Sequence, residues 1–244
     1  MFVKICGITS EEDALLAVAL GADALGFVFA PGSVRQVQPQ RVRDIVRRLP
    51  HGVATIGVFR DERPERVVEI VNRTGVSGAQ LHGREPISEV RWVRQRLSFV
   101  IQAFRADDPL LASAVNGPAD VILLDAPQPG SGRAFDWGLA DSVPLGARVM
   151  LAGGLTAENV GEAIARVKPW GVDVSTGVES APGRKDPRKL RRFIEAVRSA
   201  EPEELDLVEP VPEDPDEARR WNGPGRTSAP PRLGRPYDWA AEGW

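Results

Sequence analysis

The sequence predicts an α/β protein, a (β/α)8 TIM barrel followed by a proline-rich, acidic C-terminal extension. Short aliphatic runs alternate with amphipathic helical segments about eight times between residues 1 and 200. Such an alternation indicates parallel strands joined by right-handed crossovers. Eight units in about 200 residues lie at the compact end of the range for this barrel. An open doubly wound sheet is the alternative architecture.

The expected elements follow from the hydrophobic pattern, taken in chain order. Strands are expected at residues 2–6, 24–28, 53–58, 77–81, 98–103, 120–124, 148–151 and 170–174. Ser10 and Asp13 predict a capping box at the start of the first helix. Apolar residues at 160, 163, 164 and 167 have helical spacing, and the same spacing recurs at 190, 193, 194 and 197. The barrel domain is therefore expected over residues 1–200, and the extension over 201–244.

The composition argues against several classes of protein. A formal net charge of -3 offers no basic footprint for nucleic acid. The longest apolar stretch, residues 14–30, is interrupted by Asp23 and preceded by three acidic residues, so it fits neither a membrane span nor a signal peptide. We therefore expect a cytoplasmic protein.

The sequence has no motif for a disulfide, a metal or a cofactor. The single cysteine allows no internal disulfide, and no metal or cofactor motif is present, so we expect chemistry without a cofactor. Lysine occurs at only four positions among many arginines, which we interpret as genomic base composition.

Two strand-like runs end in side chains that could act as a base and an acid. Cys6 ends the first run and Asp125 ends the sixth, and a barrel brings all its strand ends to one active face. The period of two places Lys4 on the same face as Cys6. The alternative for Cys6 is a small buried hydrophobic residue. The alternative for Asp125 is a loop aspartate that caps backbone N–H groups.

Two glycine-bearing segments predict a phosphate site. Gly153 and Gly154 follow the seventh strand, and Thr176 and Gly177 follow the eighth. Glycine allows backbone N–H groups to approach an anion closely, and the loops after strands seven and eight commonly bind phosphate in these barrels. The alternative is a pair of tight turns without a ligand.

With these features together, the chain resembles the phosphoribosylanthranilate isomerases of tryptophan biosynthesis from Lys4 to about Val197. The resemblance rests on five segments that occur in the family's order. They are residues 4–9 (KICGIT), 80–83 (QLHG), 124–137 (containing LD, GSG and FDW), 151–155 (LAGGL) and 172–179 (VDVSTGVE).

The resemblance implies an Amadori rearrangement. In it, N-(5-phosphoribosyl)anthranilate becomes 1-(2-carboxyphenylamino)-1-deoxyribulose 5-phosphate. The family roles of general base and general acid would fall on Cys6 and Asp125. A protonated carboxyl can deliver the proton that opens the furanose ring, and a thiolate can remove the C2 proton of the resulting Schiff base. The substrate iminium and Lys4 are candidates for stabilising that thiolate.

The resemblance also implies residues that bind the substrate. Arg35 matches an arginine that meets the anthranilate carboxylate, a task that suits the guanidinium fork, with a solvated surface arginine as the alternative. Val34 stands where the family has proline, so we expect a less stiff loop. Gln80 and His82 share a strand face and could bind substrate hydroxyls or orient a catalytic group, with a structural histidine as the alternative. Asp173 could bind the ribose hydroxyls or hold its own loop.

Two regions depart from the family pattern or lie beyond it. Ser131 replaces a glycine and Arg133 adds a charge, so the loop after the sixth strand is expected to close differently. Residues 201–244 are acidic and rich in proline, which predicts disorder. Four aromatic residues in that segment (Trp221, Tyr237, Trp239 and Trp244) favour docking instead, on this barrel, on a second copy or on another pathway enzyme.

Competing functions remain open at this point. A non-catalytic phosphosugar-binding barrel would need the glycine loops but not both Cys6 and Asp125. An isomerase of the histidine pathway is expected to have aspartate at the ends of both catalytic strands, so Cys6 at the end of the first strand argues against it. A phosphoribosylanthranilate isomerase that serves secondary metabolism would have the same sequence features as one that serves tryptophan synthesis. The expected partner is a small phosphosugar, with no nucleic acid and no membrane, and both a monomer and a homodimer are compatible with the sequence.

Overall fold

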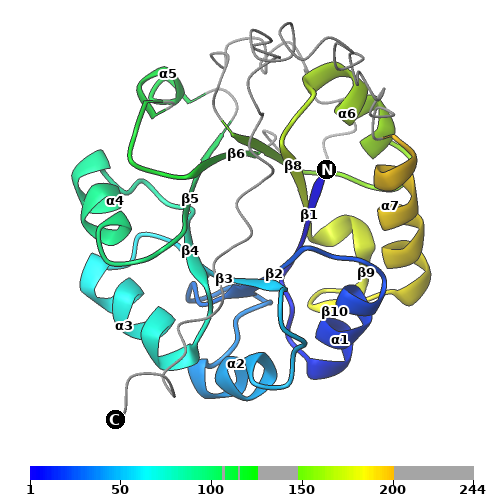
Figure 1. The fold of residues 1–244 in the computed structure, drawn as a ribbon, viewed down its shortest axis with the longest axis horizontal. Coiled ribbons are helices and arrows are strands. Elements are labelled where there is room, and N and C mark those ends of the chain that lie inside the picture. Colours follow the sequence, from blue (N-terminus) through cyan, green and yellow to red (C-terminus); the bar gives the residue numbers. More distant parts are fainter. Residues whose placement is uncertain (106–107, 115, 126–147, 201–244) are drawn as a thin grey trace, which may run out of the picture. The chain divides into compact units, whose positions relative to one another are not determined.

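The computed structural model describes residues 1–105, 108–114, 116–125 and 148–200. Within this part of the chain, parallel strands close into a barrel in the order β1 to β8, surrounded by helices (Figure 1). The barrel strands are β1 (Phe2–Cys6), β2 (Ala24–Val28), β3 (Ala54–Phe59), β4 (Gly78–Leu81), β5 (Val100–Arg105), β6 (Val121–Asp125), β7 (Val149–Ala152) and β8 (Gly171–Val174). The predicted barrel and its eight strands are thus confirmed, each strand within two residues at either end. The open doubly wound sheet is excluded.

The helices cover the outside of the barrel. They are α1 (Glu11–Ala19), α2 (Pro39–Val46), α3 (Pro64–Thr74), α4 (Ile87–Arg94), α5 (Leu111–Ala114), α6 (Val160–Val167) and α7 (Pro187–Ser199). Ser10 caps α1, because its Oγ accepts a hydrogen bond from the Asp13 N–H over 3.1 Å. Asp186 caps α7 in the same way. The apolar positions predicted for α7, residues 190, 193, 194 and 197, are all buried.

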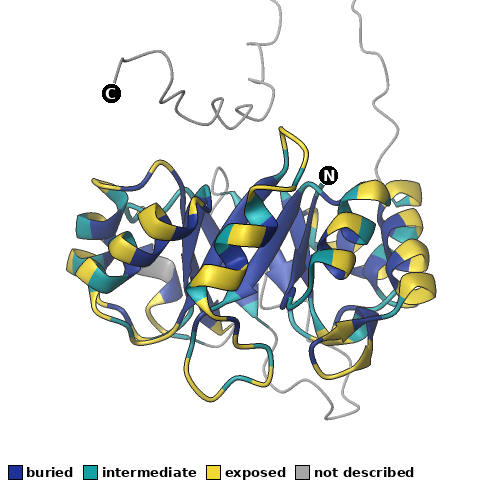
Figure 2. Cartoon of the chain, turned by 90° about the horizontal axis from the view of Figure 1, so that it is seen from below, coloured by how far each residue is buried: buried dark blue, intermediate teal, exposed yellow. Residues whose placement is uncertain are grey.

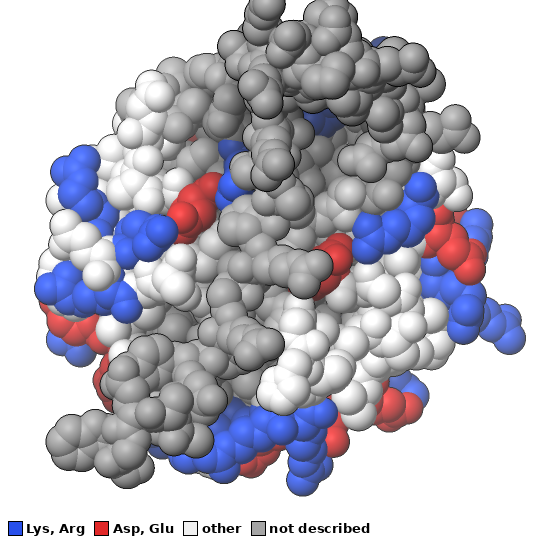
Figure 3. Space-filling view, in the orientation of Figure 1, with Lys and Arg blue, Asp and Glu red and all other residues white. Residues whose placement is uncertain are grey.

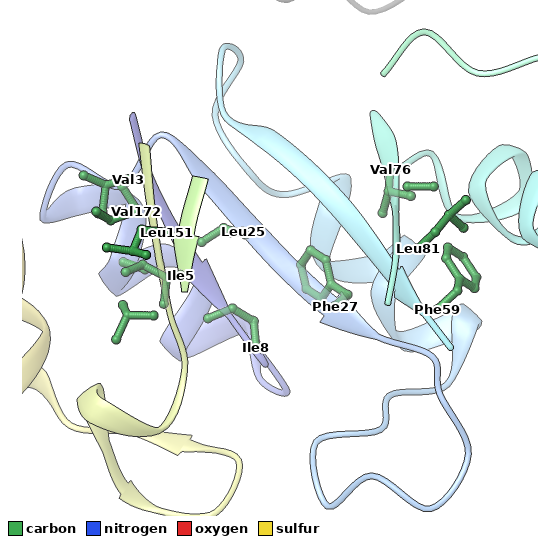
Figure 4. Packing of buried hydrophobic residues seen from close by; sticks show 14 of the residues in the cluster. Val3, Ile5, Ile8, Leu25, Phe27, Phe59, Val76, Leu81, Leu151 and Val172 are labelled. Atoms are coloured by element: carbon green, nitrogen blue, oxygen red, sulfur yellow. The ribbon is translucent and has the colours of Figure 1, made fainter. Parts of the chain in front are cut away.

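The main hydrophobic core lies between the strands and the helices. Side chains that point outward from the strands pack there, and Figure 4 shows Ile5, Leu25, Phe27, Phe59 and Leu81 among them. In Figure 2 the strands are buried while the outward faces of the helices are exposed. Figure 3 shows basic and acidic side chains interspersed around the rim of the barrel. Because the outward-pointing residues of the strands form this core, the inward-pointing residues can line the barrel interior and the site at its end.

Polar side chains occupy part of the barrel interior. Lys4 on β1 is in register with Asp173 on β8, and Cys6 is in register with Gly26 on β2. Lys4 is fully buried, and Gln80 and Asp173 are nearly so. Buried charges in a barrel interior are costly unless they are paired, so their presence near the strand ends points to function at that end.

A short hairpin after β8 has no counterpart in the sequence-based prediction. A 3-10 turn, η2 (Thr176–Val178), leads into β9 (Glu179–Ala181), which pairs antiparallel with β10 (Arg184–Lys185). The Thr9 hydroxyl donates to the Gly183 carbonyl over 2.6 Å, and the Lys185 N–H donates to Asp13 over 3.1 Å. The hairpin is therefore fastened to the segment that follows Cys6.

Some predictions fall outside the described residues. Ser131, Arg133 and the extension at 201–244 belong to this group, so the expectations for them stay predictions. In the described part of the chain, the helices lack the combination of length and apolar character that crossing a membrane requires.

Candidate active site

The predicted site residues gather at the carboxyl ends of the barrel strands. This holds for all ten of them: Cys6, Arg35, Gln80, His82, Asp125, Gly153, Gly154, Asp173, Thr176 and Gly177. Parallel strands deliver their last residues to one rim, which is why positions distant in the sequence meet there. Two groups of contacts organise this rim, one around Cys6 and one around Asp125.

Cys6 is the buried end of β1, with 8% of its surface exposed. Lys4 lies on the same face of the strand, and its Nζ donates to Asp173 Oδ1 over 2.8 Å. Gly26 supplies the room for this arrangement, because a Cβ there would lie 2.8 Å from the Cys6 Sγ and 3.1 Å from the Lys4 Nζ. A glycine on β2 thus allows a thiol and an ammonium to share the barrel interior.

Burial and nearby charge act on Cys6 in opposite directions. Burial raises the pKa of the Cys6 thiol above its ordinary value, and the positive charges of Lys4 and Lys185 oppose that rise without cancelling it. Burial by itself would lower the pKa of Lys4, but the charges of Asp173 and Cys6 and the hydrogen bonds to them together outweigh it and raise that pKa. Lys4 therefore stays a cation. It was expected to favour the thiolate, and it does oppose the effect of burial, yet the unliganded site still favours the thiol.

Asp125 is paired with His82. Asp125 ends β6, and its Oδ2 lies 3.2 Å from Nε2 of His82, which follows β4 directly. The other ring nitrogen, Nδ1, lies 2.9 Å from the amide nitrogen of Gln80. A neutral imidazole that accepts from Gln80 carries its proton on Nε2 and donates to Asp125. Both side chains are about one-third exposed, so the carboxyl faces the open mouth of the barrel.

A loop clasp holds the backbone next to His82. Glu85 accepts hydrogen bonds from the N–H of Gly83 over 2.8 Å and from the N–H of Asp61 over 2.9 Å. The Asp61 carboxylate in turn accepts from the N–H of Arg84 over 2.8 Å. A Cβ on Gly83 would collide with Asp61 and Glu85, so glycine is required after the histidine. The clasp ties the loop after β3 to the loop after β4 and fixes the position of His82.

Arg35 is held by a carboxylate of the protein. Its Nε and Nη2 donate to the two oxygens of Glu179 over 2.8 and 2.6 Å, a bidentate fork. The Arg35 N–H also donates to the Ser33 hydroxyl over 3.2 Å. Val34, which stands in place of the family's proline, is 69% exposed. The turn at Ser33 and the fork to Glu179 thus orient Arg35 without a proline.

The two glycine loops lie side by side, because β7 and β8 are neighbours in the barrel. Gly153 and Gly154 adopt φ values of 88° and 62°, which glycine tolerates best. A Cβ on Gly177 would run into the carbonyl oxygen of Leu155, so the loops touch there. Thr176 is exposed at the start of η2. Asp173, predicted to bind ribose or to hold its loop, is engaged with Lys4.

The sequence-based prediction assigned no role to Gly26, Glu179 or Lys185. One signal could have found the last of these. The chain has four lysines among many arginines, at positions 4, 168, 185 and 189. Lys4 and Lys185 are buried at the site, and Lys189 donates to the carbonyl of Glu179 over 2.7 Å. The rarity of lysine is the signal, because a compact ammonium suits the buried positions of Lys4 and Lys185, whereas Lys168 is exposed at the end of α6.

Comparison with known proteins gives a consistent result. The family model described as N-(5'-phosphoribosyl)anthranilate (PRA) isomerase matches residues 3–196. The N-(5'-phosphoribosyl)anthranilate isomerase of Desulforudis audaxviator is 49% identical over 205 residues, which cover 81% of this chain and 98% of that protein.

Solved structures agree with this result. The phosphoribosyl anthranilate isomerase of Thermus thermophilus matches with a TM-score of 0.76 and 44% identity, over 82% of this chain and 99% of that one. A phosphoribosyl anthranilate isomerase in complex with reduced 1-(o-carboxyphenylamino)-1-deoxyribulose 5-phosphate matches with a TM-score of 0.73 and 39% identity, over 82% and 99%. Another similar structure, from Thermotoga maritima, is a monomeric form of a dimeric enzyme, with a TM-score of 0.71 and 37% identity over 81% and 98%. These matches cover most of the chain, and the strand ends and glycine loops described above agree with them. The chain therefore belongs to the phosphoribosylanthranilate isomerase family of tryptophan biosynthesis.

Proposed function

We propose that this enzyme, an isomerase of phosphoribosylanthranilate in tryptophan biosynthesis, uses Cys6 as general base and Asp125 as general acid. The observation that carries the proposal is that Cys6, at the end of β1, and Asp125, at the end of β6, lie on the same rim of the barrel. Cys6 is accompanied by the buried ammonium of Lys4, and Asp125 by the imidazole of His82. Proton transfer alone suffices for the reaction.

The first step opens the ribose ring. The Asp125 carboxyl gives its proton to the ring oxygen while the anilino nitrogen forms a double bond to C1, and the C1–O bond breaks. The product is a Schiff-base cation, and Asp125 is left as a carboxylate beside His82. Donation from His82 Nε2 would stabilise that carboxylate, which lies within 3.2 Å.

The second step forms the enol. The Cys6 thiolate removes the proton from C2, the electrons move into a C1–C2 double bond, and the iminium nitrogen becomes neutral. The enol then tautomerises to the ketone. The positive charge of the bound iminium adds to that of Lys4 and opposes the effect of burial, so the thiolate forms when the substrate cation is present.

Substrate binding is assigned to the remaining rim residues. Arg35 would hold the anthranilate carboxylate, and the loops with Gly153, Gly154, Thr176 and Gly177 would hold the phosphate. Gln80 is proposed to orient His82, since its amide nitrogen lies 2.9 Å from the ring. Asp173 is proposed to keep Lys4 charged, with contact to ribose hydroxyls as a second task.

The test is the decay of anthranilate fluorescence when purified enzyme meets freshly generated phosphoribosylanthranilate. Wild type should convert the substrate. Cys6→Ala should lose about two to four orders of magnitude in kcat, the usual worth of a general base. It should still bind the reduced product analogue. A folded Cys6→Ala variant with near wild-type turnover would remove the base role. No decay with wild type would favour a phosphosugar-binding barrel or another aminosugar-phosphate substrate.

A further inference from the structure

Glu179 is a buried carboxylate that joins two cations. Its side chain, 5% exposed, accepts two hydrogen bonds from Arg35 and one from the Lys185 Nζ, the last over 3.0 Å. Burial by itself would raise the pKa of Glu179, but the hydrogen bonds and charges of Arg35 and Lys185 outweigh it and hold that pKa below its ordinary value. The carboxylate therefore stays ionised.

The planar guanidinium of Arg35 has a second pair of N–H donors besides the pair that binds Glu179. Glu179 occupies the edge of Arg35 formed by Nε and Nη2. The second edge, formed by Nη1 and the other N–H of Nη2, points away from Glu179 and has the same two-donor geometry. Among the described residues, Glu179 is the partner of the Arg35 side chain. A planar carboxylate on a ligand can bind that second edge without displacing Glu179.

Lys185 balances the charge and connects the pair to Cys6. Its Nζ donates to the Cys6 carbonyl over 2.6 Å and to the Ser175 carbonyl over 3.3 Å, in addition to Glu179. All three N–H donors of the ammonium thus have an acceptor. The same cation that neutralises Glu179 fixes the backbone of Cys6.

The hairpin β9–β10 supplies the rigidity that positioning requires. Glu179 begins β9 and Lys185 ends β10, so pairing of the two strands sets their separation. The Lys189 Nζ donates to the Glu179 carbonyl over 2.7 Å, and Asp13 accepts from the Lys185 N–H. The backbones of Glu179 and Lys185 are therefore held by hydrogen bonds as well as their side chains.

We propose that Glu179 is a positioning residue that orients the free edge of Arg35 toward the substrate carboxylate, with Lys185 as its charge partner. This inference rests on the proposed role of Arg35. It predicts that Glu179 acts on binding of the anthranilate moiety and acts through Arg35. The opposite arrangement, in which Glu179 competes with the substrate for Arg35, would give tighter substrate binding when Glu179 is neutralised.

The experiment is a double-mutant cycle on KM and kcat with Glu179→Gln, Arg35→Ala and the double variant. Glu179→Gln keeps the shape and removes the charge, so it should raise KM about tenfold with kcat changed less than about threefold. In the Arg35→Ala background the same substitution should change KM less than about twofold, because a residue that acts through Arg35 has no target there.

Arg35→Lys tests the fork without altering Glu179. A lysine can pair with Glu179 but offers no second planar edge, so KM should rise nearly as far as in Arg35→Ala. Glu69→Gln is the matched control, since Glu69 accepts from Arg66 on the exposed face of α3 and its loss should leave KM unchanged. Thermal unfolding of every variant verifies the fold.

Three results would overturn the inference. One is a folded Glu179→Gln enzyme with unchanged or lower KM, another is an equal effect of that change with and without Arg35, and the third is wild-type KM in Arg35→Lys. If Arg35→Ala itself leaves KM unchanged, the carboxylate role of Arg35 fails first. That outcome separates failure of the proposed substrate contact from failure of the positioning role.

Discussion

Lys4 and Asp173 form a buried ion pair across neighbouring strands of the barrel. The Lys4 Nζ lies 2.8 Å from Asp173 Oδ1, and the two residues are in register on β1 and β8. The pair places a fixed positive charge beneath Cys6, at a depth where an unpaired ion would be strongly unfavourable.

Removing one member of this pair should destabilise the fold. Lys4→Met leaves the Asp173 charge without a partner inside the barrel, and the free energy of unfolding should fall by about 3–5 kcal/mol. Lys4→Met/Asp173→Asn removes both charges and should regain at least about 2 kcal/mol of that loss. Urea denaturation monitored by circular dichroism measures both. A double variant as unstable as Lys4→Met would mean that packing of the lysine stem, and not the charge pair, is what matters.

Activity should pass through a maximum with pH, because Cys6 must be ionised while Asp125 still holds its proton. Burial raises the pKa of the thiol above its ordinary value, so the unliganded enzyme holds mostly thiol near neutrality. The thiolate fraction should increase about tenfold per pH unit below that pKa and then level off. Because the reaction also needs the proton of Asp125, kcat/KM should follow the product of the two fractions and fall at high pH, where Asp125 has lost that proton. The bound iminium lowers the thiol pKa in the complex, so the maximum of kcat should lie at lower pH than the maximum of kcat/KM.

Thiolate absorbance in the ultraviolet gives an independent measure of the same pKa. Cys6 is the chain's only cysteine, so the signal is unambiguous after subtraction of Cys6→Ala. A midpoint in the unliganded enzyme below about 8.5, the value of a free thiol, would contradict the dominance of burial.

Asp125 and His82 should differ in how far their loss affects turnover. Asp125→Asn removes the proposed acid and should lower kcat by about two to four orders of magnitude, with KM nearly unchanged. His82→Gln should lower kcat by about tenfold, because it removes only the partner 3.2 Å from Asp125. Steady-state fluorescence kinetics measures both.

The second histidine of the chain provides the control. His51 is exposed in a turn between α2 and β3, so His51→Gln should behave as wild type. If His82→Gln also behaves as wild type, the contact with Asp125 has no part in positioning the acid.

The contact between the two glycine loops should be essential for binding phosphate. Gly177→Ala places a methyl group against the Leu155 carbonyl and separates the loops after β7 and β8. We expect KM, and the inhibition constant of inorganic phosphate, to rise about tenfold each.

Gly161→Ala is the matched control. In α6 the new methyl group would meet only Ala200 at 3.9 Å, so KM should not change. The helix should gain about 0.5–1 kcal/mol in stability from the better helix former. If Gly177→Ala binds phosphate like wild type, the loops are ordinary turns.

The sequence pattern was sufficient to predict the barrel and the residues at the carboxyl ends of its strands. The strand positions, the alternation of inward and outward residues, the cap at Ser10 and the apolar spacing of α7 depend on local rules, and the structure agrees with them. Because the strand ends of such a barrel share one face, the rim position of Cys6, His82 and Asp125 followed without knowledge of contacts.

The sequence by itself determined the fold class, the family and which residues reach the rim, since these depend on local periodicity and on motifs in order. Only the tertiary structure decided the partners. Glu179 with Arg35, Lys185 with the Cys6 carbonyl and Lys4 with Asp173 each join residues more than one hundred positions apart in the chain. Such pairs depend on barrel closure, on the hairpin after β8 and on the space at Gly26. These are properties of packing in three dimensions, for which a periodic sequence pattern carries no signal.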